Sequence, residues 1–547
     1  MNRPWEKVYP SGLRADHPIE VTTIPVLLRR AVAAFGPRNA IEFRDRIVTY
    51  DELGAQAERF GAALLARGIG TVALYLPNTP YHPFAFFGGA LAGARLTHLS
   101  PLDAERELAH KLRDSGARLL VTTDLAGLLP MAVRLLDAGL VDLVVVGRDG
   151  DWGAGPPLAP IPDRPDIMTY AAFVAAAAPP ESWPDVSPDD VALLQYTGGT
   201  TGLPKGAMLR HGNLTAGVNI YDAWFSAINP PATAPGKMIC VLPLFHIYAL
   251  ITILLRQVQN GNEIMLRQRF DVEATLDDIE KRRATAFPGV PTMWIALANH
   301  PGLEARDFSS LLYCSSGGAP LPVEVANRFL RLTGHRLGGG WGMTETCSAG
   351  TNLPREGVIK SGSIGVPLPG LVIEVVALDD PARVLGPNET GELRIKGPNI
   401  TRGYWQRPED NETAFVDGWL LTGDIGYMDE DGWFFIVDRK KDMIISGGFN
   451  VYPQVIEQAI YEHPGVEEVL VVGIPDAYRG EAAKAFVRLR RGTEAFTLDE
   501  LKAFLADKVG RHEMPAALEF RDALPRTPVG KLSKVELRAA ERQRPQN

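Results

Sequence analysis

The 547-residue sequence lacks several features that would restrict its function to one class. Its three cysteines, Cys240, Cys314 and Cys347, are widely spaced and form no Cys-x-x-Cys pair. No histidine cluster accompanies them, so a zinc site is disfavoured. The formal net charge is −9, whereas a nucleic-acid-binding surface usually carries a basic excess. We therefore expect no nucleic-acid partner and a reducing, cytoplasmic environment.

The sequence also lacks a hydrophobic run long enough to span a membrane. The longest apolar run, residues 239–255, contains Pro243 and His246 and falls short of the roughly 20 residues that a span needs. We interpret it as a buried strand that runs into a helix. No apolar segment follows the charged first residues, so we expect neither a secretory signal nor an anchor. Peripheral membrane contact and a homodimer both remain open.

The composition, with 46% hydrophobic residues, is that of a globular protein, and the length predicts roughly three or four structural units. Between about residues 25 and 146, helix-like and strand-like stretches alternate, which is typical of parallel α/β layers. The helix-like stretches are 24–35, 50–68, 81–93 and 103–115, and the clearest strand-like runs are 71–76, 119–123 and 143–146.

The remainder of the chain divides by composition. Residues 148–190 are dense in proline and glycine and predict an irregular surface connection. A second α/β block follows to about residue 342, and short strand-like runs separated by turns over 362–437 predict a small β subdomain. The last 105 or so residues have helix-like stretches at 453–461 and 498–509 and strand-like runs at 469–472 and 485–489.

The predicted fold class is therefore α/β. We expect a large N-terminal domain over residues 1–438, with two doubly wound α/β subdomains and a small β subdomain. A separate α+β domain, which we expect to be mobile, would cover residues 439–547.

One loop, residues 196–206, carries the strongest chemical signal. It reads Tyr-Thr-Gly-Gly-Thr-Thr-Gly-Leu-Pro-Lys-Gly, and its glycines allow successive backbone N–H groups to turn toward an anion. The apolar run before it predicts a position at the carboxyl end of a strand, where α/β proteins usually bind ligands. No Gly-x4-Gly-Lys-Ser/Thr register fits, so a Walker A loop is disfavoured. The sequence predicts a phosphate site formed by Thr197, Gly198, Gly199, Thr200, Thr201, Gly202 and Lys205.

Four other residues could serve a nucleotide, although each alone is also typical of a turn or a solvated surface. Trp341 and Glu345 share a glycine-rich loop, where the ring could stack on a base and the carboxylate could hold Mg²⁺. Asp424, beside a turn, could accept both hydroxyls of a ribose, and Arg439 could bind sugar or phosphate oxygens.

The order of these motifs resembles the acyl-adenylate-forming superfamily over almost the whole chain. After the phosphate loop come Pro-Leu-Phe-His at 243–246, Gly-Gly-Ala-Pro at 317–320, Trp-Gly-Met-Thr-Glu at 341–345, Thr-Gly-Asp at 422–424, Asp-Arg-Lys-Lys at 438–441 and Gly-Lys at 530–531. Residues 391–398, 403–408, 417–441 and 446–453 most resemble bacterial long-chain fatty acid CoA ligases. Trp341 departs from the pattern, because the family usually has tyrosine there.

The resemblance implies a two-step reaction that uses ATP, Mg²⁺ and coenzyme A. A carboxylic acid first becomes an acyl-AMP with loss of pyrophosphate, and the coenzyme A thiol then displaces AMP. Lys531 would bridge the substrate carboxylate and the α-phosphate, Thr344 would contact that phosphate, and Glu345 would hold Mg²⁺. The ribose would be bound by Asp424 and Arg439, and the adenine slot would consist of Gly317, Gly318, Ala319, Pro320, Trp341 and Gly342.

The resemblance further implies a hinge at Lys441 that lets the C-terminal domain rotate and present Gly447 and Gly448 to the pantetheine arm. His246 would gate the acyl pocket. The apolar run after it favours an aliphatic acid, and the resemblance implies a medium- or long-chain one, whereas Tyr248 keeps an aryl acid of the coumarate type open. No aspartate near His246 could hold an amino group, which disfavours amino acids.

Three alternatives stay open at this stage: a dicarboxylic acid as the substrate, an acyl-AMP ligase that loads a carrier protein, and a non-catalytic binding protein. Lys531 is also a candidate target for a lysine acetyltransferase, because acetylation would remove its charge.

The sequence predicts that Lys531→Ala will slow acyl-AMP formation by roughly 100- to 1000-fold, because a positive charge would be lost where negative charge develops. Acid-dependent pyrophosphate release measures this step. Acyl-AMP formation at the wild-type rate in Lys531→Ala would contradict this role.

Overall fold

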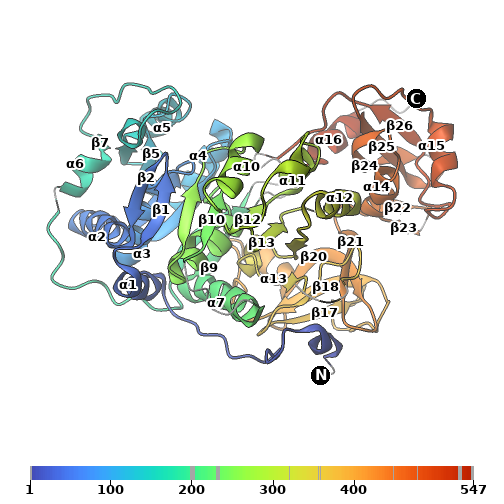
Figure 1. Ribbon diagram of the computed structural model, residues 1–547, viewed down its shortest axis with the longest axis horizontal. Helices are drawn as coiled ribbons and strands as arrows, with labels where there is room; N and C mark the ends of the chain where they lie inside the picture. The colour runs from blue at the N-terminus through green and yellow to red at the C-terminus, as the bar shows by residue number, and fades with distance from the viewer. Residues whose placement is uncertain are drawn as a thin grey trace.

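Two seven-stranded β-sheets form the larger part of the protein in the computed structural model (Figure 1). The C-terminal residues form a separate unit at one end of the molecule, beside a smaller β unit. The structure describes residues 3–175, 177–197, 204–228, 235–319, 321–354, 357, 359–447, 449–476, 478–527 and 532–543.

The first sheet has the strand order β7-β6-β5-β3-β4-β8-β9 and is parallel except for the final pair. Its inner strands are apolar and buried on both faces, as expected for a parallel sheet covered by helices. The strands are β3 Thr71–Tyr75, β4 Arg95–Leu99, β5 Leu119–Thr123, β6 Leu143–Gly147, β7 Ile167–Thr169, β8 Val191–Thr197 and β9 Lys205–Arg210.

The second sheet has the order β14-β13-β12-β10-β11-β1-β2. Its last two strands come from the first part of the chain: Ile41 pairs with Ile264 in parallel, and β1 and β2 form an antiparallel hairpin. The sequence analysis identified no strand in this region. The strands are β1 Asn39–Phe43, β2 Arg46–Thr49, β10 Lys237–Cys240, β11 Glu263–Leu266, β12 Ala286–Gly289, β13 Tyr313–Ser316 and β14 Leu337–Gly339.

Helices lie where the periodicity predicts them, and local signals set their ends. Thr23 caps α1 by accepting a hydrogen bond from the Val26 amide, and Gly116, in a left-handed conformation, ends α4. The helices of the α/β part are α1 Ile24–Phe35, α2 Tyr50–Ala66, α3 Tyr81–Leu91, α4 Glu105–Ser115, α5 Leu129–Asp137, α6 Tyr170–Ala175, α7 His211–Ile228, α8 Ile247–Ala249, α9 Arg256–Gln259, α10 Val272–Glu280, α11 Pro291–Ala298 and α12 Val323–Thr333. Short helical turns are η1 Pro4–Val8, η2 Asp149–Trp152, the π-helical η3 Leu250–Leu255, η4 Leu303–Ala305 and η5 Thr344–Thr346.

Part of the segment 148–190 is more regular than the sequence predicts. It contains η2, β7 and α6, and β7 pairs with β6 at the edge of the first sheet. The prediction of an irregular connection was wrong for residues 167–175, because a three-residue edge strand is too short to show a period between prolines.

The β subdomain and the C-terminal unit agree with the predicted pattern. The first contains β15 Thr351–Asn352, β16 Val366–Pro367, β17 Val372–Val376, β18 Gly391–Lys396, α13 Pro408–Ala414, β19 Phe415–Val416, β20 Trp419–Met428 and β21 Phe434–Arg439. The second contains β22 Ile444–Ser446, β23 Phe449–Val451, α14 Pro453–Tyr461, β24 Val466–Asp476, β25 Gly480–Leu489, α15 Leu498–Leu505, β26 Ala517–Phe520 and α16 Val535–Gln543.

The C-terminal unit has apolar clusters of its own, separate from the core that spans the two large sheets. The α/β class with a separate C-terminal domain is therefore confirmed. The boundary between residues 438 and 439 falls inside β21 and stays a prediction. Among the helices of the described residues, none is long and apolar enough to cross a membrane.

The buried amide of Asn78 ties the two large sheets together at their carboxyl edges. It follows β3 of the first sheet and is 3% exposed. Its Nδ2 donates to the carbonyl oxygens of Arg267 at 2.9 Å and Leu242 at 3.0 Å, which follow β11 and β10 of the second sheet. Its Oδ1 accepts from the Leu244 amide at 2.9 Å. One side chain thus forms hydrogen bonds with three backbone groups of the second sheet's carboxyl edge.

We expect Asn78→Ala to lower the free energy of unfolding by about 2–3 kcal/mol, because it leaves buried backbone groups unpaired. Urea unfolding followed by tryptophan fluorescence measures the change. Asn78→Asp keeps the acceptor for Leu244 but loses both donors, so it should also destabilise the protein. Wild-type stability in both variants would contradict this role.

Candidate functional site

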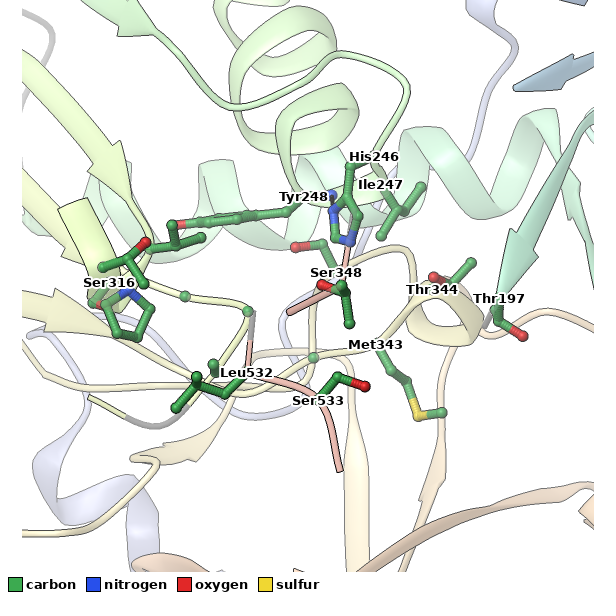
Figure 2. A pocket seen from close by; sticks show the side chains of 18 of the residues that line it. Thr197, His246, Ile247, Tyr248, Ser316, Met343, Thr344, Ser348, Leu532 and Ser533 are labelled. Atoms are coloured by element: carbon green, nitrogen blue, oxygen red, sulfur yellow. Dashed lines mark hydrogen bonds between the residues drawn. The ribbon is translucent and has the colours of Figure 1, made fainter. Parts of the chain in front are cut away.

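The carboxyl edges of both large sheets face one cavity of about 1130 Å³. Its walls come from the two α/β subdomains, the β subdomain and the C-terminal unit. Figure 2 shows residues from distant parts of the sequence around it, including Thr197, His246, Thr344 and Ser533. A large concave site where several structural units meet is the usual setting for a ligand.

The phosphate loop begins where the sequence predicts, at the carboxyl end of a strand. β8 ends at Thr197, which pairs with Lys205 of β9 in an antiparallel hairpin, and both residues line the cavity. Lys205 forms an ion pair with Asp410, and its Nζ lies 5.6 Å from the centre of the Tyr404 ring. Gly198, Gly199, Thr200, Thr201 and Gly202 lie outside the described residues.

Glu345 is buried next to this hairpin and has one hydrogen-bond donor from another part of the chain. The Tyr404 hydroxyl donates to its Oε1 at 2.8 Å. Burial raises the pKa of Glu345, and the Tyr404 bond acts in the opposite direction. Tyr404 itself is fixed against the hairpin, because it bridges to Ala207 of β9. Thr344, the preceding residue, lines the cavity (Figure 2).

Asp424 on β20 is held by two donors. The Trp341 indole Nε1 donates to Oδ2 at 2.7 Å, and the Arg439 Nε lies 3.0 Å from Oδ1. Arg439 is directly opposite Asp424 in the β20–β21 ladder, and the Asp424 charge raises the pKa of its guanidinium. Arg439 lines the cavity, whereas Trp341 and Asp424 lie behind the lining. The stacking of Trp341 on adenine stays a prediction.

On the predicted adenine side of the cavity, glycines allow neighbouring side chains and backbone groups to lie close to the main chain. Gly317 follows β13, and a Cβ there would meet the Tyr248 ring at 2.8 Å. A Cβ on Gly342 would lie 1.9 Å from the Ser348 carbonyl oxygen. Gly318 has a φ of 80°, in the left-handed region that favours glycine. Gly317, Gly318, Ala319 and Gly342 line the cavity, and Pro320 lies outside the described residues.

His246 lies at the start of the helical run that follows β10. Its Nδ1 accepts from the Tyr248 amide at 3.3 Å, so the ring caps α8. The preceding residue is also fixed, because Gln195 Nε2 on β8 donates to the Phe245 carbonyl oxygen at 2.9 Å. Gln195 in turn contacts His98 Nδ1 at 2.9 Å. Sequence reasoning missed Gln195 and Tyr404, although a polar residue inside the apolar run 191–196 is a detectable signal.

The connection to the C-terminal unit lies at the mouth of the cavity. Lys441 lines it, and burial, followed by the nearby Arg439, lowers the pKa of its ammonium group. Gly447 has a φ of 58°, with open space where a Cβ would project, and Gly448 lies outside the described residues.

The C-terminal segment around Lys531 also reaches the cavity. Lys531 lies outside the described residues, but the next residues, Leu532 and Ser533, line the cavity with Ser316 and Met343 (Figure 2). The hinge, the pantetheine path and the role of Lys531 stay predictions.

Similarity to known proteins covers nearly the whole chain. Residues 28–405 match the family described as AMP-binding enzyme, and residues 455–531 match AMP-binding enzyme C-terminal domain. The long-chain-fatty-acid–CoA ligase of Bacillus subtilis (strain 168) is 37% identical over 552 residues, with 98% of this chain and 97% of that protein covered. The feruloyl-CoA synthase of an Amycolatopsis species is 37% identical over 504 residues, covering 91% and 95%. The solved structure of ATP-bound MatB from Rhodopseudomonas palustris has a TM-score of 0.85 at 29% identity and covers 95% of this chain and 99% of that one.

The contact of Gly342 predicts the effect of one added methyl group. Gly342→Ala would force the backbone around Thr344 and Glu345 to move, and we expect it to lower the free energy of unfolding by about 1–3 kcal/mol. Urea unfolding measures this. Gly127→Ala is the matched control, because nothing lies within 4 Å of a Cβ there. Indistinguishable unfolding curves for the two variants would contradict the close contact.

Proposed function

The chain belongs to the AMP-binding enzyme family, and from this premise we propose that it ligates a medium- or long-chain fatty acid to coenzyme A. The reaction proceeds through an acyl-AMP and releases AMP and pyrophosphate. The observation that carries the proposal is the convergence of the family's motifs on one cavity: Thr197, Lys205, Thr344, Glu345, Arg439 and Lys441 all line it, although they are far apart in sequence.

In the first step, a substrate carboxylate oxygen bonds to the α-phosphorus of ATP, and the bond to pyrophosphate breaks. Two anions must approach each other, so fixed positive charge and N–H groups are needed around the phosphates. Residues 197–205 bind the pyrophosphate portion, Thr344 contacts the α-phosphate, and Lys531 lies between that phosphate and the carboxylate. Asp424, with Arg439 beside it, receives the ribose hydroxyls, since each carboxylate oxygen has a second lone pair for them.

Glu345 is suited to hold Mg²⁺, which offsets phosphate charge when it is bound. Its carboxylate is buried, and among the described residues Tyr404 is the one side chain that donates to it, so lone pairs remain for a cation. No group of three or more acidic, cysteine or histidine ligands for a metal occurs among the described residues. Mg²⁺ commonly uses one or two carboxylates together with substrate phosphates, which agrees with a single glutamate.

In the second step, the coenzyme A sulfur bonds to the acyl carbonyl carbon, and AMP leaves with its phosphate oxygen. Lys531 must first move away, and rotation about Lys441 would accomplish this while bringing Gly447 and Gly448 to the thiol path. All three cysteines are buried and none of them forms a disulfide bond, which supports the cytoplasmic location that we propose. Acetylation of Lys531 would stop the first step, and full adenylation by an acetylated preparation would refute that regulation.

An aryl acid is the second candidate substrate. Tyr248 lines the cavity, where its hydroxyl lies 3.1 Å from Ser315 Oγ, and a relative of similar identity is named feruloyl-CoA synthase. A flat ring against this face would be held by stacking and by a polar group.

Pyrophosphate release across a panel of acids tests the proposal. The panel extends from acetate through long-chain fatty acids, dicarboxylates and cinnamates, with and without coenzyme A. A coenzyme A thioester formed from a medium- or long-chain acid is the expected product. Turnover with a holo-carrier protein but not with coenzyme A would contradict the acceptor, and no turnover with any acid would contradict the enzyme assignment.

Tyr404→Phe should shift the pH dependence of Mg²⁺ use. Glu345 must be ionised to hold the cation, and its pKa is already raised by burial. The Tyr404 hydroxyl lowers the Glu345 pKa, so its removal raises that pKa further. The pH below which Mg²⁺ affinity is lost should then increase by roughly one unit. The Mg²⁺ concentration for half-maximal pyrophosphate release, measured from pH 5 to 8, tests this. Identical pH profiles in the two proteins would contradict it.

A further inference from the structure

One wall of the cavity is formed by the helical run 247–259, and only one face of that run meets the cavity. The lining residues are Ile247, Tyr248, Thr252 and Arg256. The leucines and isoleucines between them are at most 1% exposed and pack into the core. The sequence suggested a uniformly apolar wall; instead, residues four apart share the cavity face, and three of the four are polar.

Arg256 lies far from the reacting end of the cavity. His246 caps the start of the helical run, and Arg256 is eight positions beyond Tyr248. Residues 250–255 between them are π-helical, and a π-helix rises less per residue than the roughly 1.5 Å of an α-helix, so the two residues lie at most about 12 Å apart along the helix axis. The remaining wall at this end includes the aromatic residues Tyr221, Phe225 and Tyr313.

Arg256 is fixed on two sides. Its Nε donates to Asp222 Oδ1 at 2.7 Å, and its Cζ lies 4.7 Å from the centre of the Phe225 ring. The Asp222 carboxylate is already saturated, because Gln259 Nε2 donates to Oδ2 at 2.7 Å and Asn260 Nδ2 lies 2.9 and 3.1 Å from its two oxygens. Asp222 therefore orients the guanidinium.

The two terminal nitrogens at the outer edge of the Arg256 guanidinium are available to a ligand. The Arg256 side chain is 18% exposed, and within the described part of the chain its two terminal nitrogens have no hydrogen-bond partner. Two parallel N–H groups on this edge match the two oxygens of a carboxylate. The other basic residues of the cavity lining belong to its nucleotide side or to the C-terminal unit: Lys111, Lys205, Arg439, Lys441, Arg526 and Lys534.

We propose that Arg256 binds the distal carboxylate of an α,ω-dicarboxylic acid of medium chain length. This rests on the proposed ligase function but changes its acid from a fatty acid to a dicarboxylic acid of comparable length: one carboxylate is activated near Thr344, and the other meets Arg256. A span of at most about 12 Å corresponds to at most roughly ten bonds at about 1.2 Å each, less the reach of the arginine, so chains of roughly six to ten carbons fit. A methyl terminus in this position would leave the two terminal nitrogens without an acceptor.

The test compares two acids of equal length, suberate and octanoate, in the wild-type protein and in Arg256→Leu. Pyrophosphate release gives kcat/KM, and mass spectrometry identifies the coenzyme A thioester. We expect the wild type to prefer suberate by at least about 10-fold. In Arg256→Leu the suberate-to-octanoate ratio should fall by roughly 10- to 100-fold, mainly through KM, because the bidentate partner is lost and an apolar end replaces it.

Two further variants separate recognition from folding. Arg256→Lys keeps the positive charge but loses the two parallel N–H groups of the guanidinium, so it should retain only part of the suberate preference. Arg256→Leu combined with Asp222→Leu removes the ion pair as a unit, and its ratio should stay low even where its melting temperature matches the wild type. Arg134→Leu, at an exposed arginine on α5 that pairs with Glu105, should leave the ratio as in the wild type.

Preference of the wild type for octanoate would overturn the proposal, as would a ratio that does not change in Arg256→Leu. In that case the Arg256–Asp222 pair serves only to join α9 to α7. Octanoate turnover with an unchanged ratio would leave the ligase function standing, whereas absence of turnover with either acid and with the wider panel would overturn both.

Discussion

The buried side chain of Asn78 imposes the constraint on which the site depends. It hydrogen-bonds to backbone groups of the second sheet that directly precede Phe245 and His246, so it fixes the carboxyl edges of the two sheets relative to each other. Gln195 adds a second tie from β8 to Phe245. The predicted phosphate hairpin begins on the first sheet and the proposed acyl wall on the second, so two amide side chains hold these two parts of the cavity in place relative to each other.

The carboxylates at and near the cavity differ in how many hydrogen bonds they accept from the protein. This difference distinguishes carboxylates with a structural role from carboxylates that can still bind a ligand. Asp222 is saturated by Arg256, Gln259 and Asn260 and serves only to orient the arginine. Among the described residues, the side chains that donate to Asp424 are those of Trp341 and Arg439, and Tyr404 is the one that donates to Glu345, which leaves lone pairs on both. Burial makes an unsatisfied carboxylate costly, so each open position is best explained by a ligand that completes it.

Much of the architecture could be predicted from the sequence, because helix periodicity and glycine turns are local signals. The helices at 24–35 and 103–115 and the strand at 119–123 were found at or near their observed bounds. The pairing of β1 with β11 could not be predicted, because it joins strands far apart in sequence, and β7 is too short to show a pattern. Motif order identified residues such as Glu345 and Arg439, but not their partners: the bond from Tyr404 to Glu345 and that from Trp341 to Asp424 depend on tertiary structure alone.

The pairing of β1 with β11 has a consequence for synthesis on the ribosome. Residues 39–49 emerge early as a hairpin whose edge has no neighbour until Ile264 has been made, and all seven strands of the first sheet are translated in the interval. An unpaired strand edge attracts other chains, and charged residues commonly protect such edges. Arg44, Asp45 and Arg46 occupy the tip of this hairpin, and Glu42 lies on β1 itself. These charged residues thus disfavour association of the nascent hairpin with other chains until its partner strand β11 has been synthesised.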